Sequence, residues 1–192
     1  MALNEDTLVQ QTTADYLRDA LGWRSGYAYN TEVLGPEGSF GRKSEQDVVL
    51  TRILGEKLMT LNPGLPDAAY RDALRQIVEV GAGLRGMAAN REKYQLLRDG
   101  VKVSYRKLDD TLEARTLRVL DFDTPENNDF LAVRELWVKG ELYRRRPDII
   151  GFVNGIPLLF IECKNIHKNL RKAYDQNLKD YQDTIPHLFH HN

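Results

Sequence analysis

Two acidic residues stand at the ends of two apolar segments in the last third of the chain. Asp148 precedes the segment 149–153, and Glu162 follows the segment 157–161, with Lys164 two residues further on. Two neighbouring carboxylates repel one another unless a cation lies between them, and the usual cation is a hard divalent ion bound by oxygen atoms. A metal, two acids and a lysine suit phosphodiester hydrolysis, because the metal polarises the phosphate while the lysine orients or deprotonates the attacking water. The alternative is a buried salt bridge at a strand end.

Whether these side chains meet depends on the turn at residues 154–155, whose Asn-Gly sequence is the strongest hairpin signal in the chain. A strict two-residue loop would place Asp148 opposite Ile161 and turn Glu162 to the other face of the sheet. A three-residue loop would place Asp148 across from Glu162, with Cβ atoms about 5 Å apart. Such loops are common when they contain glycine. We therefore predict the three-residue loop, or a bulge with the same effect, so that Lys164 shares the face of both acids.

The first half of the chain has the periodicity of helices. We predict helices at 8–21, 48–58, 69–78 and 90–98. Ser44 and Asp47 form an acidic variant of the capping box ahead of the second helix. The glycine-rich stretch 23–43 is predicted to be irregular.

The second half has the two-residue period of strands. We predict strands at 101–106, 115–119, 130–138, 148–153 and 157–164. The last two strands are apolar on both faces, which places them centrally between helices. A final helix carries an apolar stripe from Leu170 to Tyr181. The predicted fold class is α/β, with a mixed, mostly antiparallel central sheet flanked by helices.

Length and composition favour one domain that works inside the cell. The chain has 192 residues, and we predict a mainly helical part (1–99) followed by a sheet part (100–192). One cysteine excludes an internal disulfide, and no apolar run approaches the roughly 20 residues of a membrane span. We expect a cytoplasmic location, no membrane partner and solvated histidines at 167, 187, 190 and 191.

The net charge of -1 argues against binding nucleic acid through bulk charge alone. The charge is uneven, because residues 1–63 hold 6 basic and 9 acidic side chains whereas the rest of the chain holds 21 and 19. Arg144, Arg145 and Arg146 directly precede the first acidic motif. In a nuclease they would lie beside the DNA backbone, so we predict phosphate contacts for them.

The run RRRPDIIGFVNGIPLLFIECKN resembles the nuclease domain at the N-terminus of type I restriction-modification motor (R) subunits. Its Pro-Asp and Glu-Cys-Lys elements are the signature of the PD-(D/E)xK nuclease superfamily, and the NGIPL hairpin between them is specific to this family. Further stretches outside this run also resemble the family. LVQQTTADYLRDALGW and RELWVKG precede the run, and AYDQNLKDYQDTIPHLFHHN follows it. The resemblance covers nearly the whole chain and implies a restriction-endonuclease-like fold.

The resemblance implies a role for each residue of the motif. Asp148 and Glu162 would bind Mg²⁺, for which Mn²⁺ could substitute, and the carbonyl of Cys163 would be a third ligand. Lys164 would be the catalytic lysine.

Two accessory positions depart from the family pattern. The family has a Gln-x-x-x-Tyr element on the last helix, but Gln176 and Tyr181 are five residues apart. Because Asn177 and Tyr181 share the apolar stripe, Asn177 would fill the place of the glutamine, unless a distorted first turn brings in Gln176. Where many relatives have an acidic residue on the first helix, this chain has glutamines at 10 and 11, and we assign neither as a ligand.

The implied partners are double-stranded DNA and the methyltransferase (M) and specificity (S) subunits of a type I complex. No P-loop pattern occurs, so we expect this chain neither to bind ATP nor to translocate; ATP would serve a motor further along a longer protein. The family core has another strand after the last helix, and its loss would leave an open sheet edge that invites self-association.

Two other functions remain open on the sequence. One is a stand-alone repair or recombination nuclease of the same superfamily. The other is a non-catalytic docking domain of the motor subunit. Binding of a divalent ion by the two acids would favour a nuclease over a docking domain.

Overall fold

The computed structural model describes residues 5–81, 84, 86–107, 109–163, 171 and 173–191. At its centre is a four-stranded sheet in the order β1-β4-β7-β8. Its strands are β1 (Arg24–Tyr27), β4 (Phe130–Arg134), β7 (Ile149–Val153) and β8 (Ile156–Ile161). β1 is parallel to β4, and the other two pairs are antiparallel. The α/β class and the mixed, mostly antiparallel sheet are therefore confirmed.

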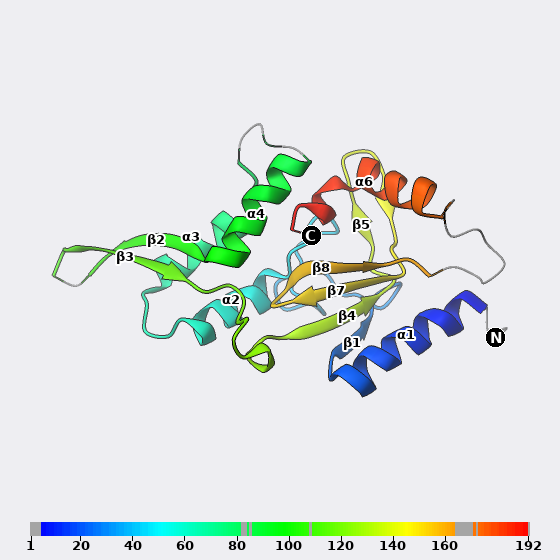
Figure 1. Cartoon of the computed structure of the whole chain (residues 1–192), viewed down its shortest axis with the longest axis horizontal. Helices are drawn as coiled ribbons and strands as arrows, with labels where there is room; N and C mark the ends of the chain where they lie inside the picture. The colour runs from blue at the N-terminus through cyan, green and yellow to red at the C-terminus, as the bar shows by residue number, and fades with distance from the viewer. Residues whose placement is uncertain are drawn as a thin grey trace.

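Helices cover both faces of this sheet (Figure 1). They are α1 (Glu5–Leu21), α2 (Thr51–Leu61), α3 (Asp67–Val78), α4 (Met87–Asp99) and a π-helical segment, Ala173–Leu178, that continues into α6 (Lys179–Thr184). Short 3₁₀ turns occur at Pro125–Asn127 and Pro186–Phe189. In the described part of the chain, no helix is long and apolar enough to cross a bilayer.

The two faces of the sheet bury different apolar sets. On the α1 face, Leu17 packs with Ala132 and Ile149. On the opposite face, Ile150 and Phe152 join the main core, which contains the buried residues of α2 and α3. Alternate side chains along a strand point to opposite faces, so a strand covered on both sides must be apolar throughout. This explains the uninterrupted apolar run of β7.

The hairpin between β7 and β8 combines a tight turn with a bulge. Asn154 and Gly155 have φ angles of 51° and 80°, as a two-residue type I′ turn requires. The predicted three-residue loop is therefore wrong. The register shifts between Gly151 and Phe152 because Leu158 is an extra residue on β8. The bulge that we predicted as the alternative is what forms, and beyond it Ile149 pairs with Ile161.

Part of the stretch predicted to be irregular is a strand. β1 runs beside β4, with Tyr27 opposite Arg134. Its sequence, Arg-Ser-Gly-Tyr, lacks apolar alternation, and among the described strands β1 is the outer one on that side of the sheet. The N-terminal third thus contributes to the central sheet.

The predicted capping box at Ser44 does not start a helix. Asp47 accepts hydrogen bonds from the backbone N–H groups of Lys43 and Ser44, at 2.8 and 3.1 Å, but α2 begins only at Thr51. The backbone N–H of Leu50 instead donates to the carbonyl of Gly155 at 2.8 Å. The polar motif therefore closes a local turn and the segment after it docks on the hairpin.

Three strand predictions need correction. β2 (Val101–Arg106) and β3 (Leu112–Leu117) form a separate two-stranded ribbon that extends away from the sheet (Figure 1). The strand predicted at 130–138 is interrupted at Glu135, whose φ is 53°, after which β5 (Val138–Lys139) pairs with β6 (Arg144–Arg145). β8 is not central: within the described residues it is an outer strand and half-buried along 158–161. Self-association through this edge stays a prediction.

The predicted solvated histidines differ from one another. His191 is 5% exposed, and its Nε2 lies 2.9 Å from the carbonyl of Ile77 at the end of α3. Burial lowers the pKa of His191 to about 4. His187 and His190 are half-buried and have lowered pKa values for the same reason, whereas His167 lies outside the described residues. The prediction is wrong for His191, which packs the end of the chain against α3.

Candidate active site

The two predicted acids lie side by side at one end of the sheet. Asp148 and Glu162 directly flank the paired residues Ile149 and Ile161, so the antiparallel register sets them across from one another. Oδ2 of Asp148 accepts a hydrogen bond from the backbone N–H of Cys163, at 2.6 Å. This contact joins the start of β7 to the end of β8 and depends on the bulge, since a slip of one residue would reverse the direction of Glu162.

Asp148 is also held by the first helix. The side-chain amide of Gln10 donates to Oδ1 of Asp148 at 2.7 Å, and Gln10 is only 6% exposed. Gln11 instead donates to Asp15, at 2.9 Å, within the same helix. The sequence left open which of the two glutamines stands near the acids, and the structure assigns Gln10 to that position.

Glu162 is held by the last helix. Asn177 donates from its amide to Oε1 of Glu162, and Tyr181 donates from its hydroxyl to Oε2, both at 3.2 Å. Burial raises the pKa of the Tyr181 hydroxyl strongly, and the negative charges of Glu162 and Asp148 raise it further. The phenol therefore stays protonated and acts as a donor.

The described part of the last helix contains a distorted turn, which is the condition for Gln176 to take the place of Asn177. The π-helical turn over Ala173–Leu178 holds one more residue than an α-helical turn. Asn177 and Tyr181, four residues apart, are the pair that contacts Glu162. The side chain of Gln176 lies outside the described residues, as does Lys164.

The oxygen atoms gathered here suit a hard divalent cation. Carboxylate and carbonyl oxygens are the ligands that Mg²⁺ prefers. Amide, phenol and backbone groups donate hydrogen bonds to both acids and orient the carboxylates. Among the described side chains, no group of three His, Cys, Asp or Glu residues could hold a metal. A cation here would therefore need further oxygen atoms, such as the backbone carbonyl of Cys163.

The three consecutive arginines before Asp148 are engaged in ion pairs. Their acidic partners, with the shortest distances, are Glu45 for Arg144, Asp180 for Arg145 (2.8 Å) and Glu135 for Arg146 (3.6 Å). Arg144 also lies 3.7 Å from the ring centre of Trp137. A DNA phosphate would have to compete with these carboxylates, so the phosphate contacts stay a prediction.

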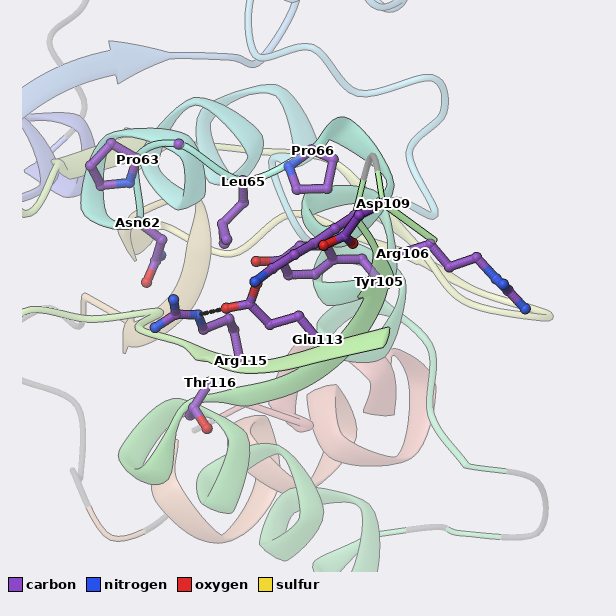
Figure 2. A pocket seen from close by; sticks show the side chains of 12 residues that line it. Asn62, Pro63, Leu65, Pro66, Tyr105, Arg106, Asp109, Glu113, Arg115 and Thr116 are labelled. Carbon is purple, nitrogen blue, oxygen red and sulfur yellow. Dashed lines mark hydrogen bonds and ion pairs between the residues drawn. The ribbon is translucent and has the colours of Figure 1, made fainter. Parts of the chain in front are cut away.

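An open pocket of about 1000 Å³ lies elsewhere, between the α2–α3 connection and the β2–β3 ribbon. Figure 2 shows Leu65 and Tyr105 at this pocket and the ion pair between Glu113 and Arg115, whose atoms are 2.6 Å apart. None of the residues predicted for catalysis lines it. The acids instead lie at the sheet end, where Asp148 contacts α1 and Glu162 contacts the last helix.

A mixed sheet with two carboxylates at adjacent strand ends, flanked by a helix on each face, defines a restriction-endonuclease-like α/β protein. The chain belongs to the family of type I restriction enzyme R protein N-terminal domains, whose family model, "Type I restriction enzyme R protein N terminus (HSDR_N)", matches residues 2–192. The predicted family resemblance is confirmed.

Curated relatives agree with this family. The chain is 36% identical over 194 residues to the type I restriction enzyme HindI endonuclease subunit of Haemophilus influenzae, a match that covers 99% of this chain. It is 27% identical over 197 residues to the "Putative type I restriction enzyme MjaIXP endonuclease subunit" of Methanocaldococcus jannaschii, which covers 97% of this chain. In both matches the chain spans only 18% of the relative's length.

Proposed function

We propose that this domain is the endonuclease of a type I restriction enzyme R subunit and hydrolyses DNA phosphodiester bonds with Mg²⁺. The observation that carries the proposal is the convergence of Asp148 and Glu162, each oriented by a different helix. The relatives named as endonuclease subunits support the same reaction. When bound, the cation would polarise the scissile phosphate and activate a water molecule.

The residues around the acids would keep the site ready for the ion. Asp148 and Glu162 would hold the cation together with the carbonyl of Cys163, and Mn²⁺ would substitute for Mg²⁺. Gln10 fixes one carboxylate, and Tyr181 helps to fix the other. A preset geometry lowers the reorganisation needed when charge develops in the transition state. Lys164 would orient or deprotonate the attacking water.

The rest of the functional proposal concerns the longer protein. A motor elsewhere in the R subunit would use ATP to move DNA, and cutting would follow translocation in the cytoplasm. The M and S subunits would supply methylation and recognition of the target sequence. The substrate of the domain described here would be double-stranded DNA.

Two variants at the acids test the catalytic assignment. In the full R subunit assembled with its partner subunits, Asp148→Asn and Glu162→Gln should each reduce DNA cleavage about 1000-fold or more, the upper range for removing an electrostatic catalytic group. The matched control is Asp183→Asn, which removes an exposed carboxylate from α6. Titration with Mn²⁺ should show binding that both site variants weaken.

Cleavage at the wild-type rate by Asp148→Asn would contradict the catalytic assignment. No binding at millimolar Mg²⁺ or Mn²⁺ would favour the docking domain instead.

A further inference from the structure

The sheet end that carries the acids also carries an arginine stacked on a tyrosine. Tyr27 ends β1 and Arg134 ends β4, and the two residues are paired across the parallel strands. The guanidinium carbon of Arg134 lies 5.1 Å from the centre of the Tyr27 ring. On its other side, Arg134 pairs with Ile149, the residue after Asp148. The stacked pair is therefore one strand away from the candidate active site.

Arg134 differs from the three arginines that precede Asp148. Each of those has an acidic partner, whereas Arg134 has no ion pair with any residue of the described part of the chain. Its Nε atom is buried and has no hydrogen-bond partner there. A buried polar group without a partner costs free energy, and an explanation in native proteins is an absent water, ion or ligand. For a guanidinium, the matching ligand is an oxyanion.

Aromatic side chains continue from Arg134 along the same end of the molecule. The ring centres of Tyr27 and Tyr29 are 6.5 Å apart, and those of Tyr29 and Trp137 are 6.4 Å apart. The guanidinium carbon of Arg146 lies 4.3 Å from the Tyr29 ring centre. Tyr27 and Tyr29 are each 41% exposed. Three rings in a row, with the guanidinium groups of Arg134 and Arg146 over them, thus form a surface that solvent and ligands can reach.

Glu135 connects this surface to the acids. Its backbone N–H donates to the carbonyl of Asp148 at 2.9 Å. Its carboxylate accepts a hydrogen bond from the Tyr27 hydroxyl, at 3.2 Å, and lies 3.6 Å from Arg146. Glu135 therefore partly neutralises the charge of Arg146. Arg134 lacks such a carboxylate in the described part of the chain, so it is the stronger binding site of the two for an anionic ligand.

We propose that Arg134 binds a phosphate of the DNA strand that is cut at Asp148 and Glu162, with Tyr27 supporting its guanidinium. This inference rests on the proposed nuclease function and names the residue that positions its substrate. Arginine offers a planar fork of donors that matches two phosphate oxygens, and stacking on a ring limits the motion lost on binding. Tyr29 and Trp137 would border the flanking part of the same strand.

DNA binding without cleavage tests the contact. The 192-residue chain is titrated into a fluorescently labelled DNA duplex in EDTA, and anisotropy is recorded over a range of salt concentrations. Arg134→Gln should weaken binding about tenfold at low salt and reduce the slope of log K against log salt by about 0.9, the value for one phosphate contact. Arg134→Lys should recover part of the affinity, since it keeps the charge but loses the fork.

The matched control lies at the other end of the neighbouring strand β1. Arg24→Gln removes an equal charge from β1, where Arg24 pairs with Asp129 away from the acids. Thermal melting of all variants checks that they fold, and Arg134→Lys provides the comparison if Arg134→Gln is unstable. An unchanged slope in Arg134→Gln, or an equal loss in Arg24→Gln, would overturn the contact.

The contact and the catalytic assignment fail in distinguishable ways. If Asp148→Asn still cuts DNA while Arg134→Gln loses one unit of salt slope, the phosphate contact stands and the catalytic assignment falls. If Asp148→Asn abolishes cleavage while Arg134→Gln binds DNA like the wild type, the catalytic assignment stands and the phosphate contact falls.

Discussion

The two ends of the β7–β8 hairpin satisfy polar groups in opposite ways. At the turn, Asn154 is fully buried, and its amide donates to the carbonyl of Val119 and to Asn128 at 2.8 and 2.9 Å. Its side-chain oxygen accepts the backbone N–H of Asp129 at 2.7 Å. At the other end, two carboxylates converge and accept hydrogen bonds from amide, phenol and backbone groups. A buried amide network at one end fixes the fold, whereas the other end brings two acids together.

The comparison predicts that the turn end controls stability and the acidic end controls activity. Hydrogen bonds within a buried neutral network are costly to break, because the partners stay buried without replacements. Donors to a carboxylate at a metal site act mainly through ligand geometry. Substitutions at the two ends should therefore separate the two properties.

The largest effect is expected for Asn154→Ala. The substitution removes a buried hydrogen bond to the carbonyl of Val119 and two half-buried ones to Asn128 and Asp129, and it should lower the free energy of unfolding by about 3 kcal/mol, near 1 kcal/mol for each. Chemical denaturation measured by circular dichroism gives this value. The matched control Asn30→Ala changes an exposed asparagine and should alter the free energy little. If Asn154→Ala lowered the free energy of unfolding no more than Asn30→Ala does, the proposal that the turn end controls stability would be wrong.

Tyr181→Phe should affect activity more than stability. The variant keeps the ring that packs edge-on against Phe160, with centres 5.1 Å apart, but removes the donor to Glu162. Cleavage should fall about 10-fold to 100-fold, as is usual for groups that orient metal ligands. Tyr174→Phe, at a ring that is 66% exposed, is the control. Wild-type cleavage with a greatly lowered melting temperature would reverse the comparison.

The smallest effect is expected for Gln10→Glu, which should alter only the melting temperature and the affinity for Mn²⁺. It replaces the amide that donates to Asp148 with a second carboxylate, which repels Asp148 when no cation is present. We expect a lower melting temperature in EDTA and tighter Mn²⁺ binding, measured by calorimetry, because the site gains an oxygen ligand. Gln11→Glu serves as the control, since Gln11 contacts Asp15 instead. Unchanged Mn²⁺ affinity in Gln10→Glu would contradict a metal site beside Asp148.

The sequence predicted the parts of the site that depend on local pattern. The Asn154-Gly155 turn and the continuous apolar runs were sufficient to place Asp148 across from Glu162, given a bulge. The spacing of the last helix likewise placed Asn177 and Tyr181 on one stripe, and both contact Glu162. These features are set by neighbours in the chain, which periodicity records directly.

Features that depend on distant partners were not predictable from the same patterns. Gln10 meets Asp148 across 138 positions, and within its own helix only the buried face that it shares with Ala14 and Leu17 distinguishes it from Gln11. β1 has no apolar alternation and is a strand only because β4 lies beside it. The alternation of β2 and β3 predicted strands correctly but could not show that they pair only with each other. In each case tertiary contacts, and not local propensity, decide the outcome.

The bulge at Leu158 lets the candidate active site tolerate one extra residue in β8. An in-frame deletion of Leu158 would return the hairpin to the two-residue register along its whole length and still leave Glu162 across from Asp148. A variant that kept Leu158 but paired it within the ladder would instead turn Glu162 to the other face of the sheet. The distance in sequence between the two acids is therefore compatible with their convergence only while the bulge absorbs that residue.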